Sequence, residues 1–274
     1  MAGEFDYEVS RKVWEAAVPI EFQTENDDDS EDSCRPCYAM LPRCSYFPLH
    51  LPRILEQAKS RSDSVKLDPD KVWLECNGSP LKTYYPVGVL FDLHKAPESP
   101  TITVVIKTGP RPEGVLSVSK DTMESMFMQS LKEANYLKRR KDEIVSSMKI
   151  DEHKQLWLSL THDRFDDFWS INRRLMESNE ERPFFDIPIR LYVLGKPFRQ
   201  VLQPPLDGNG EHRTLSHSLN SLSSDLVEDG KYRFISHGIV VPLETPLIYL
   251  ARNFAYPDNF VHVCAIFNRN ETDG

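Results

Sequence analysis

The feature that constrains the fold most is a long stretch, 119–176, which contains neither proline nor glycine and lies between two β-rich halves. Proline and glycine interrupt helices, so their absence predicts a helical region. Ser119 and Asp121 are the alternative N-caps of its first helix. Apolar residues recur at three- and four-residue spacing further along, so we expect Trp157 and Trp169 to be buried in a core.

The half before this region alternates short apolar segments with turns. We predict two short strands or a hairpin, a short helix, a strand–turn–strand, a second short helix and a last strand, at 13–24, 53–61, 72–85, 86–93 and 101–108. This succession is that of a ubiquitin-like β-grasp, in which a mixed sheet curls around one helix. The final strand of that fold is central, which suits the apolar run at 102–106.

The half after Pro183 repeats the architecture without repeating the sequence. It has a hairpin, a helix, a further strand region, a short helix and an apolar strand, at 187–204, 214–222, 233–241, 245–255 and 260–267. We therefore predict an α+β chain in which ubiquitin-like domain A and ubiquitin-like domain B flank a central helix-rich domain. The expected bounds are an N-terminal segment 1–10, domain A 11–108, the helix-rich domain 118–180 and domain B 185–268.

Bulk properties exclude several classes of function. The formal net charge is −9, which argues against nucleic-acid binding, since neutralising phosphates requires clustered Lys and Arg. No window approaches the roughly 18 apolar residues of a membrane span, and the N-terminus does not resemble a secretory signal. Any membrane role is therefore expected to be peripheral. Five cysteines, an odd count, indicate a reducing compartment such as the cytoplasm.

Motifs for catalysis and cofactors are not found. The sequence has no phosphate-binding loop, no dinucleotide fingerprint, no hydrolase elbow and no paired-histidine metal motif, so we expect neither an enzyme nor a cofactor. Cys34 and Cys37 form one C-x-x-C, but no second ligand pair follows, which favours a pair of surface-loop thiols over a zinc or redox site. Cys76 and Cys264 lie on expected strands and are interpreted as small core residues.

A basic run, Lys138–Lys141, stands out in an acidic chain. The default interpretation is a solvated helix face, and the alternative is a surface that contacts anionic lipid or an acidic partner. A third possibility is that the run surrounds one lysine with a chemical role.

Several strings together resemble the autophagy protein 5 family, and they occur in the family's order. They are VWEAAVPIEF, MLPRCSYFPL, YYPVGVLFDL, EHKQLWLSLTHDRFDDFWSINRRLM and ETPLIYLARNFAYPDNFVHV. The resemblance extends from about residue 11 to residue 267. The loops at 25–37 and 205–231 do not follow the family pattern closely.

The resemblance implies a scaffold for autophagy that is not itself an enzyme. In that family a lysine in a K-E-A string, here Lys132, receives the C-terminal glycine of autophagy protein 12, a ubiquitin-like modifier. The conjugate binds the N-terminal helix of autophagy protein 16. It then acts as an E3-like factor that promotes transfer of autophagy protein 8-type proteins from the conjugating enzyme, autophagy protein 3, to phosphatidylethanolamine. The implied location is the cytoplasm and, peripherally, the phagophore membrane.

The residues themselves support Lys132 only in part. At 100° per residue, Lys132 lies opposite the apolar stripe that contains Met123 and Phe127, so its amine should face outward. Lys141 falls on that same stripe, which requires a kink or a snorkelling side chain. Geometry does not single out Lys132 among the lysines. Two other hypotheses stay open: a non-covalent tandem ubiquitin-like adaptor for partner helices, and a cysteine hydrolase acting on ubiquitin-like proteins.

Overall fold

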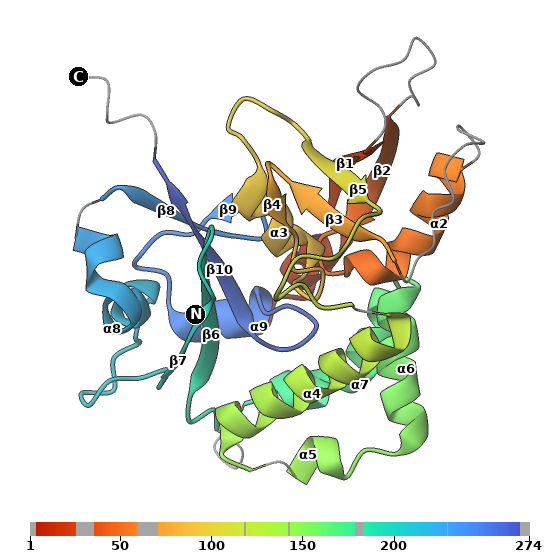
Figure 1. Ribbon diagram of the computed structural model, residues 1–274. Helices are drawn as coiled ribbons and strands as arrows, with labels where there is room; N and C mark the ends of the chain where they lie inside the picture. The colour runs from red at the N-terminus through yellow and green to blue at the C-terminus, as the bar shows by residue number, and fades with distance from the viewer. Residues whose placement is uncertain are drawn as a thin grey trace. The chain divides into compact units, whose positions relative to one another are not determined.

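The computed structural model describes residues 4–25, 36–59, 71–117, 119–141, 143–178, 183–228 and 230–268 (Figure 1). Its backbone divides into two units, one formed by 16–124 and the other by 1–15 together with 125–274. Each unit contains one five-stranded sheet. No helix in the described ranges is both long enough and apolar enough to cross a membrane.

The first unit is a mixed sheet with the strand order β2-β1-β5-β3-β4. Its strands are β1 (Ala17–Thr24), β2 (Cys37–Pro42), β3 (Trp73–Cys76), β4 (Ser79–Pro80) and β5 (Ile102–Lys107). β1 runs parallel to β5 and antiparallel to β2. The apolar strand β5 is central, as predicted, and its alternate residues Ile102, Val104 and Ile106 are buried.

Two helices belong to this unit, α2 (Phe47–Lys59) and α3 (Val87–His94). The helix α2 begins six residues earlier than predicted, because Pro48 falls in its first turn, where a missing N–H costs no hydrogen bond. Its buried face includes Phe47, whose ring meets Phe22 of β1 edge-on at 6.2 Å between centroids. The unit therefore has the sheet and the covering helix of a β-grasp.

The predicted hairpin at 13–24 is wrong. Its first residues complete helix α1 (Tyr7–Glu15), and the rest form the single strand β1. Pro19 is compatible with this strand because the parallel pairing with β5 begins only at Ile20, so the missing N–H lies outside that ladder.

The second unit contains most of the helical region. Its helices are α4 (Lys120–Arg139, of which 125 onward belongs here), α5 (Glu143–Ser146), α6 (Ile150–Thr161) and α7 (Phe165–Met176). Ser119 caps α4, as one of the two predicted alternatives, by accepting a hydrogen bond from the Thr122 N–H at 3.1 Å. α6 and α7 pack against each other (Figure 1), and α1 packs on α7.

The helix α4 ends before Lys141, which corrects the expected continuous stripe. Arg140 adopts the left-handed conformation, with φ 57°, and its N–H donates to the Tyr136 carbonyl at 2.6 Å. This is a common way to end a helix, although glycine is the usual residue. Val145 and Met148, which follow the end of α4, are buried from the separate segment around α5.

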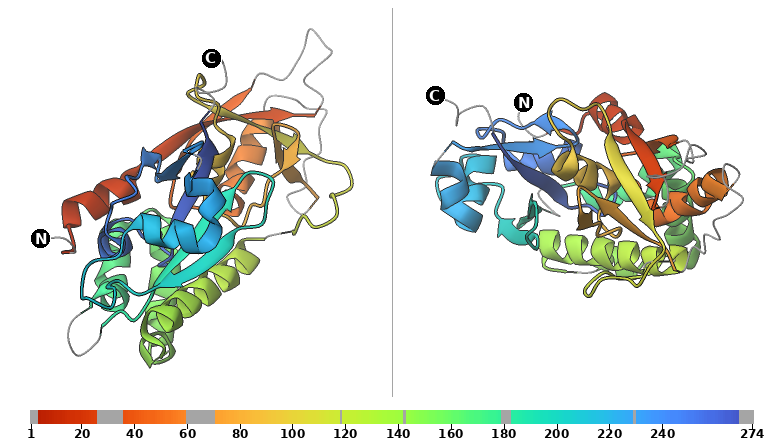
Figure 2. Two further views of the ribbon diagram at one scale, coloured as in Figure 1. Left: turned by 90° about the vertical axis from the view of Figure 1, so that its left-hand side faces the viewer. Right: turned by 45° about the horizontal axis from the view of Figure 1, so that its top comes forward.

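The second sheet has the order β7-β6-β10-β8-β9. Its strands are β6 (Ile187–Val193), β7 (Arg199–Gln203), β8 (Tyr232–Ser236), β9 (Ile239–Val240) and β10 (Val261–Phe267). α8 (Leu215–Glu228) and α9 (Leu247–Asn253) contribute Leu215, Leu219 and Leu247 to one core with the strands. Figure 2 gives two further views of the ribbon. Because this order matches that of the first sheet, the predicted α+β class with two β-grasp sheets and a helical region between them in sequence is confirmed.

The N-terminal segment is fastened to distant parts of the second unit. The Asp6 N–H donates to the Asn253 Oδ1 of α9 at 2.7 Å, and the Asn253 Nδ2 donates to the Glu4 carbonyl at 3.2 Å. The Tyr7 hydroxyl donates to Asp166 of α7. Residues 4–15 thus bridge α7 and α9 within one unit.

The two tryptophans of the helical region differ. Trp157 is 3% exposed, as predicted, whereas Trp169 is only half-buried, which corrects the prediction of full burial. Trp169 lies at the edge of α7, where Phe5 stacks on it at 4.3 Å and Phe165 lies 6.2 Å away. The N-terminal segment that supplies Phe5 was not assigned to this surface.

Replacing Trp169 with alanine should therefore lower the free energy of unfolding by only about 1–2 kcal/mol, less than the usual cost of a fully buried tryptophan. Urea unfolding of Trp169→Ala beside the wild-type protein measures this. Phe5→Ala should weaken the same stack and cost less still. A loss of 4 kcal/mol or more for Trp169→Ala would show that the ring is buried.

Candidate functional site

Lys132 lies in the middle of α4 and is half-buried. Stepping along the helix at 100° per residue groups it with exposed positions three residues before and four residues after, namely Gln129 and Tyr136. The opposite side of α4 contains buried Phe127 and Leu131. The lysine is therefore at the border of the solvent-facing stripe, and its long stem can extend the amine into solvent.

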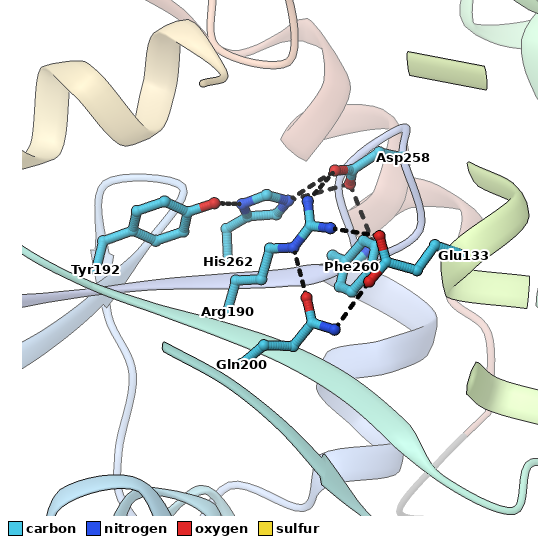
Figure 3. A network of polar contacts seen from close by, with 7 residues as sticks. All are labelled: Glu133, Arg190, Tyr192, Gln200, Asp258, Phe260 and His262. Atoms are coloured by element: carbon cyan, nitrogen blue, oxygen red, sulfur yellow. Dashed lines mark hydrogen bonds and ion pairs between the residues drawn. The ribbon is translucent and has the colours of Figure 1, made fainter. Parts of the chain in front are cut away.

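The residue next to Lys132 attaches α4 to the second sheet. Glu133 accepts hydrogen bonds from the Arg190 Nη2 of β6 at 3.2 Å and from the Gln200 Nε2 of β7 at 3.0 Å (Figure 3). Arg190 and Gln200 are direct partners in the β6–β7 ladder. The Arg190 Nε also donates to the Gln200 amide oxygen, Oε1, at 3.0 Å. One helix residue is thus held by two neighbouring strands.

Arg190 is the centre of a larger polar network. Its guanidinium carbon lies 3.5 Å from the centre of the Phe260 ring, and its Nη1 lies 3.5 Å from the Asp258 Oδ2. The side chain is buried, so its charge must be compensated nearby. Asp258 and Glu133 supply two carboxylates, and the phenylalanine ring supplies a cation–π contact.

Asp258 continues the network into the sheet. Its carboxylate accepts from the Phe260 N–H at 3.2 Å and lies 3.1 Å from the His262 Nε2 (Figure 3). Burial alone would raise the pKa of the Asp258 carboxyl, but His262 and Arg190 outweigh burial, so the pKa is lowered. The carboxylate is therefore ionised in the folded protein at neutral pH.

His262 completes the chain of contacts through its Nδ1, which lies 2.8 Å from the Tyr192 hydroxyl. Tyr192, His262 and Asp258 are all buried. Although tyrosine, histidine and aspartate in a row resemble a proton relay, no substrate reaches them. The arrangement is a rigid support that fixes β6 and β10 beneath the α4 segment that carries Lys132.

The structure contradicts the solvated-face interpretation for half of the basic run. Lys138 is 1% exposed and Arg139 is buried, whereas Arg140 and Lys141 are exposed. Both buried cations point to the C-terminal end of α7: the Lys138 Nζ and the Arg139 Nη2 each donate to the Leu175 carbonyl at 3.3 Å. Helix C-termini attract cations, and the lipid-contact interpretation is wrong for these two residues.

Burial changes the chemistry of Lys138. Burial first, and then neighbouring Arg139, lower the pKa of the Lys138 ammonium to about 7, against a smaller opposing effect of Asp258. The Phe184 ring lies 5.3 Å from the Nζ. The amine is enclosed and cannot reach another protein, so it is no rival to Lys132 as an acceptor.

Sequence reasoning missed the Arg190 network, although two signals were present. One is an arginine in the middle of an otherwise apolar strand, IPIRLYV. The other is the pair Asp258 and His262, which lie four residues apart in the string YPDNFVHV. A charged residue inside a buried strand requires a counter-charge, and Asp258 can supply it for Arg190.

The cysteines do not form a catalytic or metal site in the described part of the chain. Cys76 is fully buried, and burial raises the pKa of its thiol to about 11, which disfavours the reactive thiolate. Cys264 is also buried, and the Cys37 Sγ donates to Gln57. Within the described ranges no three His, Cys, Asp or Glu side chains gather to hold a metal ion, and Cys34 lies outside those ranges.

Comparisons with known proteins agree along most of the chain. Family models described as Autophagy protein ATG5 match in three parts: the UblA domain at 13–108, the alpha-helical bundle region at 120–178 and the UblB domain at 186–265. Autophagy-related protein 5 of Caenorhabditis elegans is 42% identical over 268 residues, which cover 94% of this chain and 97% of the relative.

Two further comparisons give the same result. Autophagy protein 5 of Drosophila melanogaster is 36% identical over 263 residues, covering 94% of this chain and 96% of its own. The crystal structure of Kluyveromyces marxianus Atg5 superposes with a TM-score of 0.81 at 21% identity, over 95% of this chain and 100% of that one, which shows a shared fold. The chain therefore belongs to the autophagy protein 5 family.

Proposed function

We propose that this chain is the acceptor of autophagy protein 12, joined through Lys132, and that the conjugate works in autophagosome formation. With the N-terminal helix of autophagy protein 16, it acts as an E3-like factor for autophagy protein 3. The reaction it promotes attaches autophagy protein 8-type proteins to phosphatidylethanolamine. The chain contributes binding and positioning and has no catalytic residue of its own. Its membrane contact is peripheral and transient, from the cytoplasmic side.

The observation that supports this proposal most directly is the placement of Lys132. The lysine borders the solvent-facing stripe of α4 in the helical region of the family fold, and Glu133 beside it is held by β6 and β7. A conjugation site must be accessible to another protein and still be held at a fixed position. Lys138, six residues later in the same helix, is buried and cannot be reached by another protein.

The bond-forming step requires little from this chain. The Lys132 ammonium first loses a proton to a base or to water. The amine lone pair then attacks the carbonyl carbon of the modifier's C-terminal thioester, the C–S bond breaks and the thiolate leaves with its electron pair, while the nitrogen loses a second proton to the thiolate or to water. The product is an isopeptide amide. Lowering the barrier by desolvation and orientation falls to the conjugating enzyme.

The second candidate function is a non-covalent tandem ubiquitin-like adaptor that holds partner helices. The two β-grasp sheets favour protein binding in either case, so the covalent bond is the property that separates the candidates. The cysteine-hydrolase hypothesis loses its nucleophile among the described cysteines, because Cys76 and Cys264 are buried.

Denaturing electrophoresis of the chain from cells tests the covalent bond. We expect a second band, heavier by the mass of the modifier, that persists after boiling in reductant. Purified conjugate should also accelerate attachment of an autophagy protein 8-type protein to phosphatidylethanolamine vesicles by at least tenfold over an equimolar mixture of the unjoined proteins. A single unshifted band, or equal rates for conjugate and mixture, would support the non-covalent adaptor.

A further inference from the structure

We propose that Tyr136 docks the enzyme that presents the modifier thioester to Lys132. This inference rests on the proposed function and specifies the surface on which the transfer occurs. Tyr136 lies four residues after Lys132 on α4, and its side chain is 54% exposed. Residues at this spacing lie about 5–6 Å apart on the same side of a helix.

The exposure of Tyr136 differs from that of the other large apolar residues of α4. Met123, Phe127 and Leu131 are buried on the far side of the helix. A single exposed aromatic residue is unremarkable by itself. This one shares its helix face with the candidate acceptor, and a second exposed aromatic ring lies just beyond the end of the helix.

That second ring is Phe185, which is 45% exposed. Its N–H donates to the Lys138 carbonyl at 2.7 Å, which fixes it beside the last turn of α4. Arg140 connects these two residues: its N–H donates to the backbone carbonyl of Tyr136, and its guanidinium carbon lies 5.3 Å from the Phe185 ring. The surface therefore starts at Lys132 and continues through Tyr136 to Arg140 and Phe185.

The geometry of transfer identifies the occupant. A lysine side chain has a four-carbon stem, so its amine stays within about 6–7 Å of its own Cα. Any protein that holds a thioester over Lys132 must also cover the helix surface about one turn away on either side. On one side this is Gln129, and on the other it is Tyr136. A tyrosine supplies a large, rigid contact area and is enriched in binding hot spots.

Two charged side chains near Tyr136 are paired within the chain. Arg140 pairs with Asp186 at 3.2 Å, and Glu133 pairs with Arg190 at 3.2 Å. Docking therefore depends on contact with the ring more than on long-range attraction. We expect the contribution of Tyr136 to persist at high ionic strength, where interactions between exposed charges are screened.

The test is reconstituted transfer from the cognate conjugating enzyme, charged with autophagy protein 12 as a thioester, to the full-length chain at varied concentration. Tyr136→Ala should raise KM for the chain about tenfold and leave kcat within about twofold, because docking is weakened while the chemistry at the amine is unchanged. Tyr136→Phe should behave as the wild-type protein does. Tyr136→Arg, which keeps helix propensity, should show the same rise in KM, also in 0.5 M salt.

Leu158→Ala is the matched control, since it removes an exposed apolar side chain from α6 and should leave KM unchanged. Thermal melts of all variants confirm folding. An unchanged KM for both Tyr136→Ala and Tyr136→Arg, or a fall in kcat alone, would overturn the docking role. In that event Lys132→Arg separates the docking role of Tyr136 from the proposed acceptor function. Loss of the conjugate in Lys132→Arg supports the acceptor function alone, and normal conjugation overturns both proposals.

Discussion

Replacing Lys132 with arginine should lower the amount of conjugate with autophagy protein 12 by a factor of more than about 100. Arginine keeps the positive charge and has nearly the same helix propensity. Its guanidinium stays protonated in proteins and is not a nucleophile, so it cannot form the isopeptide bond. Because Lys132 is only half-buried, the exchange should change the free energy of unfolding by no more than about 0.5 kcal/mol.

The measurement is a denaturing gel from cells in which Lys132→Arg is the only copy of the chain. Lipid attachment of the autophagy protein 8-type protein should fall with the conjugate, while binding of the autophagy protein 16 helix should persist. The matched control is Lys120→Arg, at the exposed first residue of the same helix, which should conjugate normally. A conjugate band of normal strength from Lys132→Arg would move the site to another lysine.

Replacing Lys138 with methionine should remove much of the rise in stability between pH 7 and pH 10. In the folded chain, burial and Arg139 lower the pKa of Lys138 to about 7, whereas an unfolded lysine titrates near ~10.4. Between these values the unfolded chain binds more protons than the folded chain, so stability rises with pH. Below pH 7 both states are protonated and the cost of the buried charge is present in full.

The size of the effect follows from the shift. At about 1.4 kcal/mol per pKa unit, the difference between a pKa of about 7 and one of ~10.4 corresponds to ~5 kcal/mol, an upper limit because buried sites relax around a charge. Methionine preserves the length and removes the charge. The Leu175 carbonyl keeps a donor in the variant, because Arg139 also bonds to it. Lys138→Met should therefore be more stable than the wild-type protein at pH 6, by roughly 1–3 kcal/mol.

Urea unfolding at pH 6, 8 and 9.5 measures both proteins. The wild-type protein should gain stability across this range faster than the variant, so that the difference between them shrinks toward pH 9.5. Lys120→Met, a lysine exposed at the start of α4, should follow the wild-type curve. Parallel curves for Lys138→Met and the wild-type protein would mean that Lys138 keeps its proton throughout.

What the sequence predicts well is local. The Ser119 cap, the central strand β5 and the order of elements in the second half depend on short-range patterns of turns, alternation and helix breakers, and the structure has them. Resemblance added Lys132, which no periodicity singles out. These predictions use information within a few residues of each position.

What the sequence does not predict depends on contacts distant along the chain. Lys138 and Arg139 look like solvated charges because helical periodicity gives no sign of the α7 carbonyl end, 36 to 38 residues further on, that accepts their hydrogen bonds. The charge of Arg190 is likewise balanced by Asp258, 68 residues away. Trp169 was expected in a core because a stripe on a helix shows which residues are apolar and not how deeply each is covered.

The bridge formed by residues 4–15 has a consequence for how the chain is made. Asp6 leaves the ribosome before its hydrogen-bond partner Asn253, which lies 247 residues later in the chain. At about 5–20 residues per second, α1 waits roughly 10–50 s for α9. During synthesis the buried face of α1, with Val13 and Trp14, lacks its final cover. The N-terminal helix can pack on α7 first, but its docking is complete only once α9 is made, and until then it exposes apolar surface that a chaperone on the nascent chain can bind.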